Sequence, residues 1–67
     1  MVGYKIQFLR SRLHLTQEEL AGKVRMDRSH LGKIENGLAN PSIKTLYLIA
    51  QALEVRLSSL FKSDPNI

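Results

Sequence analysis

The sequence contains no cysteine among its 67 residues, which excludes disulfide bonds and a cysteine-based zinc site. Only His14 and His30 offer imidazole ligands, and no other ligand-type residues cluster with them, so we expect neither a metal nor any other cofactor. No apolar run approaches the roughly 20 residues that a membrane-spanning helix needs. The first residues lack the apolar core and cleavage site of a secretory signal. These absences predict a cytoplasmic protein that has no contact with a membrane.

The short length limits the chain to one domain, and a domain of this size buries only about 60% of the surface of its unfolded chain. Its stability must therefore come from packed helices, with help from a partner subunit. Hydrophobic residues make up 43% of the sequence and charged residues 24%, as in folded rather than disordered chains. The net charge of +4 favours a polyanionic partner if the basic residues gather on one face.

The apolar residues fall into short helical blocks, and no stretch alternates as a strand does. The first block covers about residues 2–13, where one stripe steps by 4, 3 and 4 residues. The stripe consists of Val2, Ile6, Leu9 and Leu13. The second block begins with a capping box, in which Thr16 caps the amide of Glu19 and Glu19 reaches back to Thr16. Leu15 and Leu20 flank this cap as a hydrophobic staple, so a second helix starts here and ends near residue 24 or 25.

The third block opens at Asp27, a good N-cap residue. It stops at Asn36 and Gly37, because both residue types tolerate left-handed backbone angles. Pro41 then fits the first turn of a fourth helix over about residues 42–53, where its missing N–H would be unpaired anyway. The fourth helix offers five residues to the core: Ile43, Leu46, Ile49, Ala50 and Leu53.

The end of the chain divides into a structured and an unstructured part. Residues 58–61 can form one last short helix, whereas residues 63–67 are typical of a flexible tail. We therefore expect one folded domain over residues 1–62.

The second and third blocks are separated by only two or three residues. Such a tight turn makes two short helices cross steeply, as in a helix-turn-helix. Only a small side chain fits where these helices approach most closely, and Ala21 occupies that position. Five apolar residues supply the core that the two helices and the turn share: Leu20, Val24, Met26, Leu31 and Ile34.

Residues 15–37, LTQEELAGKVRMDRSHLGKIENG, resemble the xenobiotic-response-element family of helix-turn-helix proteins. This family includes phage repressor and Cro proteins, restriction–modification controller proteins and many small bacterial regulators. The segment NPSIKTL at residues 40–46, with AQAL at 50–53 and LF at 60–61, is similar to the rest of that domain. The resemblance extends over about residues 4–62.

The resemblance implies an all-α, five-helix lambda-repressor-like domain that binds a two-fold-related operator in double-stranded DNA as a homodimer. The recognition helix, at about residues 28–36, would lie in the major groove. The base-contacting residues by position are Arg28, Ser29 and Lys33. The residues expected to contact phosphates are Gln17, Arg25, His30, Asn36, Asn40 and Lys44. Arg10 and Glu35 match an ion pair that is frequent in the family and is expected to be structural.

Arg25 departs from the family pattern, because the same turn position is often glycine. A non-glycine residue costs about 1 kcal/mol if the backbone there is left-handed. Either the turn has a different shape, or the cost is accepted for a further phosphate contact.

An apolar patch near the C-terminus is assigned to self-association, since a two-fold interface needs one self-complementary surface. The patch consists of Val55, Leu57, Leu60 and Phe61. The same patch leaves open a second function, that of an antitoxin-like or protein-interaction module whose main partner is another protein. A third interpretation is a fragment of a larger repressor, against which the starting methionine and the full helix set argue mildly.

Catalysis is not expected, because Ser29, His30 and Glu35 lie too close together on one short helix to form a hydrolytic triad. Nothing in the sequence indicates a small-molecule effector site. An activator would additionally contact RNA polymerase, but no sequence rule identifies such a surface.

Overall fold

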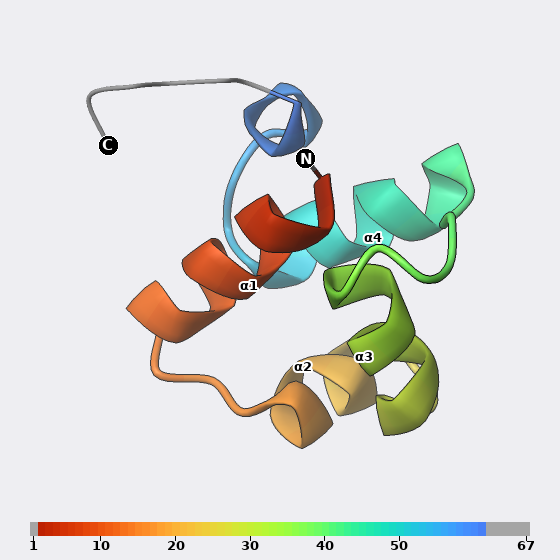
Figure 1. Ribbon diagram of the computed structural model, residues 1–67. Helices are drawn as coiled ribbons and strands as arrows, with labels where there is room; N and C mark the ends of the chain where they lie inside the picture. Colours follow the sequence, from red (N-terminus) through yellow and green to blue (C-terminus); the bar gives the residue numbers. More distant parts are fainter. Residues whose placement is uncertain (1, 62–67) are drawn as a thin grey trace.

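The computed structural model describes residues 2–61 (Figure 1). These residues form four α-helices and one 3-10 helix, with no β-strand among them, as expected for the all-α class. The elements are α1 (Val2–Arg12), α2 (Gln17–Lys23), α3 (Arg28–Glu35), α4 (Ile43–Ala52) and η1 (Leu57–Leu60). The expected count of five α-helices is therefore not confirmed, because the last element is a single 3-10 turn. The tail expected at 63–67 lies outside the described residues.

The beginnings of the helices follow local side-chain chemistry. The predicted capping box of α2 is confirmed: the Glu19 amide donates to Thr16 Oγ1 at 3.0 Å, and the Thr16 amide donates to Glu19 Oε1 at 2.8 Å. Asp27 is the N-cap of α3, but its side chain makes no capping hydrogen bond. The N-cap of α4 is Ser42, whose Oγ accepts from the amide of Thr45. Pro41 consequently precedes the cap, and the prediction that it lies in the first turn was wrong.

All four α-helices end in the same hydrogen-bonded reversal, with a left-handed residue just after the C-cap. At the end of α2, Met26 N donates to Ala21 O at 2.9 Å and Arg25 N donates to Gly22 O at 3.3 Å, which is the Schellman pattern. The left-handed residues are His14, Arg25, Gly37 and Glu54. The predicted stop of α3 at Asn36 and Gly37 is confirmed, and only this helix uses glycine for the reversal.

The core lies where the helices meet, and ten apolar residues form it: Ile6, Leu20, Ala21, Leu31, Ile34, Leu46, Ile49, Ala50, Leu53 and Leu60. Two residues that were expected inside lie outside it. Leu13 is 40% exposed because α1 already ends at Arg12 and the chain reverses at His14. Ile43 is 65% exposed because the first turn of α4 extends past the elements that cover the rest of that helix (Figure 1).

The contact of α1 with the end of α3 depends on Gly3, a residue that the sequence analysis did not single out. Gly3 is buried, and a Cβ atom there would collide with the carbonyl oxygen of Ile34 and lie 2.8 Å from that of Glu35. Backbone oxygens cannot move aside as a flexible side chain can. Glycine therefore permits the approach that holds α3 against the rest of the molecule, with α2 and α3 on one side and α1, α4 and η1 on the other (Figure 1).

Candidate nucleic-acid interface

The α3 helix has one buried and one exposed side. Leu31, Ile34 and Glu35 are buried. The exposed side carries the three predicted base-contacting residues, together with His30. Because α3 begins at Arg28, Arg28 and Ser29 lie in its first turn, and Lys33 follows about one turn later. The helix thus presents a cation and a hydroxyl group to solvent in its first turn and a second cation in its last turn.

An open hollow of about 650 Å³ lies beside the first turns of α2 and α3. Its lining residues are Arg10, Thr16, Gln17, Glu18 and Arg28. The fold therefore brings together two residues with different predicted roles, Gln17 for phosphate and Arg28 for bases. Arg28 is the guanidinium group of this hollow without an acid partner in the described chain, because Arg10 is paired with Glu35, and the Glu18 carboxylate also lines the hollow.

Arg10 and Glu35 form a two-pronged ion pair, with Nε donating to Oε2 at 2.7 Å and Nη2 donating to Oε1 at 3.0 Å. Arg10 Nη1 also donates to the carbonyl oxygen of Leu15 at 2.8 Å. The Glu35 side chain is almost completely buried, so its charge must be compensated by this geometry. The pair joins the end of α1 and the following loop to the end of α3, and it thereby sets the position of α3.

Gln17 has a partner inside the protein that the sequence analysis missed. Its Nε2 donates to Glu35 Oε1 at 2.9 Å, and its side chain lies 3.6 Å from where a Cβ of Gly32 would be. Gln17 is therefore half-buried against α3. An amide NH₂ group has two donors, so one N–H is left for a further contact after the bond to Glu35.

The turn between α2 and α3 is left-handed at Arg25, with φ of 58°. The alternative of a differently shaped turn is therefore wrong, and the chain accepts the cost of a side chain at this position. Arg25 is exposed, so its guanidinium group gains no internal contact that would offset this cost.

The other residues predicted to contact phosphates, His30, Asn36, Asn40 and Lys44, are all exposed, but they do not form one cluster. Asn36 is the C-cap of α3, and Lys44 lies in the first turn of α4. Asn40 lines a separate hollow of about 250 Å³ between the start of α1 and the loop that precedes α4.

The structure corrects one member of the predicted dimer patch. Leu60 is 1% exposed and belongs to the core of the single chain, because η1 packs onto α4 and α1. Val55 and Leu57 are partly buried against the same core. Phe61 is exposed, at 53%, so Phe61 with the partly buried Val55 and Leu57 stays a prediction for self-association, without Leu60.

Residues 2–61 contain no group of three histidine, aspartate or glutamate side chains that could hold a metal ion. Within the same residues, no helix is both long and apolar enough to cross a membrane.

The two short helices α2 and α3, packed together across a turn of four residues, define a helix-turn-helix domain. A family model described as helix-turn-helix matches residues 6–60. The chain is 41% identical over 66 residues to the immunity repressor protein of Bacillus phage phi105, which covers 98% of this chain and 46% of that repressor.

Solved structures agree with this assignment. The restriction–modification controller protein C.AhdI from Aeromonas hydrophila superposes with a TM-score of 0.87 at 35% identity, covering 90% of this chain and 91% of that one. The N-terminal DNA-binding domain of SinR from Bacillus subtilis gives a TM-score of 0.88 at 32% identity, covering 97% and 96%. The chain belongs to the helix-turn-helix family, and its expected resemblance to phage repressors and controller proteins is confirmed.

Proposed function

We propose that this chain is a sequence-specific DNA-binding transcription regulator that places α3 in the major groove and binds a two-fold-related operator as a homodimer. The observation that carries the proposal is the division of α3. Its inner side is held by the core and the Arg10–Glu35 pair, whereas Arg28, Ser29 and Lys33 are exposed on its outer side. The similarity to SinR, which has been solved in complex with DNA, supports the same conclusion.

The chemistry of the exposed residues suits the reading of bases. Arg28 can donate two parallel hydrogen bonds to O6 and N7 of guanine, the most common specific contact in the major groove. Ser29 both donates and accepts, and is therefore less selective. Lys33, about one turn further along, can contact either a guanine or a phosphate.

Contacts with phosphates would fix the position of α3 on the duplex without reading sequence. The second N–H of Gln17 is available for one of these contacts while the first holds Glu35. Arg25, which has no internal role, is available for another. Because each neutralised phosphate releases counterions, affinity should fall steeply as salt rises.

The two-fold arrangement follows from the small size of one recognition surface. A single short α3 reads few base pairs, and a symmetric dimer doubles the site while matching the local symmetry of DNA. The partner-protein alternative predicts instead that no DNA sequence is preferred.

Binding-site selection from random duplex DNA at near-physiological salt tests this proposal. We expect enrichment of an inverted repeat whose half-site centres lie about one helical turn, roughly 34 Å, apart. Selection with Arg28→Ala in parallel should relax one base position in each half-site. Weak, salt-sensitive binding without any enriched sequence would refute the proposal and favour a protein partner.

A further inference from the structure

The α4 helix carries three exposed large apolar residues. Ile43 is 65% exposed, Tyr47 51% and Leu48 38%. Tyr47, Leu48 and the exposed Gln51 lie on the side of α4 that faces away from the core, and Ile43 lies beside Tyr47 at the exposed first turn. We call Ile43, Tyr47, Leu48 and Gln51 the outer α4 face. Contiguous apolar surface of this kind marks an interaction site more often than scattered single residues do.

The two ends of this face carry opposite charges. Lys44 lies in the first turn of α4, and Glu54 lies just after its C-terminal end, where the left-handed backbone at φ of 63° directs the chain away. Both residues are exposed. The one ion pair within residues 2–61 joins Arg10 and Glu35, so neither Lys44 nor Glu54 has an ion-pair partner in the described chain.

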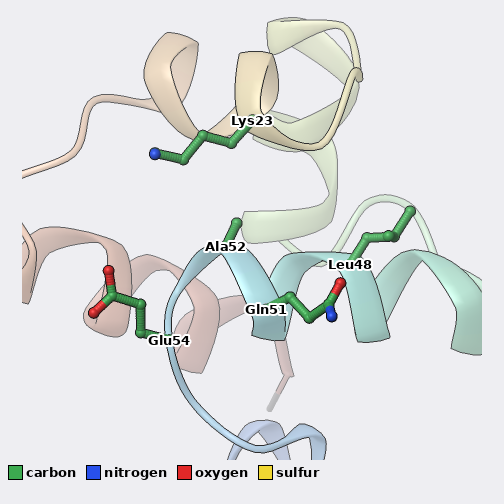
Figure 2. Close-up of a pocket in the computed structure, with 5 residues that line it drawn as sticks. All are labelled: Lys23, Leu48, Gln51, Ala52 and Glu54. Carbon is green, nitrogen blue, oxygen red and sulfur yellow. The ribbon is translucent and has the colours of Figure 1, made fainter.

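A hollow of about 390 Å³ adjoins the C-terminal half of the face. Lys23 of α2 lies across from Ala52, while Leu48 and Glu54 lie to either side (Figure 2). The hollow is large enough to receive an apolar side chain, and Leu48 and Tyr47 project from the same surface. The face therefore contains both protruding apolar groups and a recess.

We propose that the outer α4 face binds the same face of a second copy, with the two α4 helices antiparallel. This inference rests on the homodimer of the proposed function and names its surface. A two-fold axis at the height of Ile49 brings Lys44 toward Glu54 of the partner subunit, five residues to either side in the sequence, with Glu54 just past the C-cap of α4. The same axis brings Tyr47 near Gln51 of the partner subunit, two residues to either side. Within one chain Gln51 Nε2 donates to the Tyr47 hydroxyl at 3.3 Å, so the two copies would meet across these bonded pairs.

The distribution of charge selects this arrangement over others. Parallel helices would bring Lys44 against its own symmetry mate and Glu54 against its own, and like charges repel. An unrelated partner needs only a complementary surface, whereas a two-fold interface needs a patch that complements itself. Apolar residues at the centre with opposite charges at equal distances from it meet that requirement.

Sedimentation equilibrium without DNA tests the surface directly, and it avoids the phosphate contact predicted for Lys44. We expect Tyr47→Lys to raise the dissociation constant of the dimer at least tenfold while the helical circular dichroism stays unchanged. Phe61→Lys is the matched control, because Phe61 is equally exposed but lies on η1, and it should leave the constant within threefold of the original.

A charge exchange tests the antiparallel pairing. Lys44→Glu and Glu54→Lys should each weaken the dimer several-fold, whereas the double variant should return to within about threefold of the original, because the partners are exchanged together. Weakening by both single variants without recovery in the double variant would refute the antiparallel pairing.

Two further outcomes separate failure of this inference from failure of the proposed function. Dissociation by Phe61→Lys but not by Tyr47→Lys would place the interface at η1, which overturns the inference and leaves a dimeric regulator intact. A wild-type chain that stays monomeric in solution and on selected DNA would overturn both. If the inference holds, Tyr47→Lys should still bind an isolated half-site as tightly as the wild type.

Discussion

The charged residues on the two sides of α3 differ in burial and in hydrogen bonding. Glu35, on the inner side, is 5% exposed and accepts three hydrogen bonds from Arg10 and Gln17. Arg28 and Lys33, on the outer side, are exposed and make no side-chain hydrogen bond within residues 2–61. The charge of Glu35 helps to hold α3 in position, whereas Arg28 and Lys33 are accessible to a ligand. The inner residues of the eight-residue helix α3 therefore contribute to stability, and we expect the outer residues to contribute to binding. Substitutions on the inner side should change the free energy of unfolding, and substitutions on the outer side should change the affinity for DNA.

The largest effect is expected on the inner side. Glu35→Ala removes the partner of two side chains and leaves the Arg10 guanidinium group partly buried without its counter-charge. The free energy of unfolding should fall by about 3–5 kcal/mol, which urea denaturation measures. Glu18→Ala is the control, because Glu18 is exposed and should change stability by less than about 0.5 kcal/mol. Similar small losses for both variants would contradict a structural role for the pair.

A somewhat smaller loss is expected where α1 meets the end of α3. Gly3→Ala places a methyl group against two backbone oxygens, and overpacking of this kind costs about 1–3 kcal/mol. Gly22→Ala is the matched control, because nothing lies within 4 Å of a Cβ atom there. Alanine favours a helix over glycine, so Gly22→Ala should raise stability by about 0.5–1 kcal/mol. Thermal denaturation of both variants would show opposite shifts, and equal shifts would exclude the close approach.

On the outer side, Arg28→Ala should leave stability within about 0.5 kcal/mol, because the side chain is exposed. The Arg28→Ala substitution should instead weaken binding to the selected operator by about 1–3 kcal/mol and relax the preference at one base position. Fluorescence anisotropy with the operator and with single-base variants measures both. A uniform loss on every sequence would identify Arg28 as a phosphate contact instead.

The smallest effect is expected at Arg25, in the turn between α2 and α3. Arg25→Gly relieves a left-handed residue and should stabilise the fold by about 1 kcal/mol. The same substitution should weaken DNA binding and reduce its salt dependence by about one counterion. His14→Gly, at an equally left-handed position, should give the gain in stability alone. If Arg25→Gly leaves affinity and salt dependence unchanged, the phosphate contact is excluded.

Much of the local structure could be predicted because it depends on neighbouring residues. The Thr16–Glu19 capping box and the stop at Gly37 involve groups a few residues apart, whose chemistry is the same in any fold. The pairing of Arg10 with Glu35 came from the family resemblance, since nothing local links residues 25 positions apart.

The errors have a common origin in the packing of distant segments. Leu60 was expected on the surface, yet η1 folds onto α4 and α1 and buries it. Ile43 was expected inside, yet the first turn of α4 has nothing to cover it. Periodicity shows which residues share a side of a helix, but not whether another element lies against that side.

By itself, the sequence determined the helical blocks, their starts and stops, and the helix-turn-helix with its exposed basic residues, because capping, turn chemistry and periodicity act over a few residues. Only the folded molecule shows that Gly3 admits two carbonyl oxygens, that Gln17 bonds Glu35, and that Leu60 is buried while Ile43 is exposed. The physical reason is that close contact and burial depend on segments far apart in the chain, whose approach no local pattern encodes.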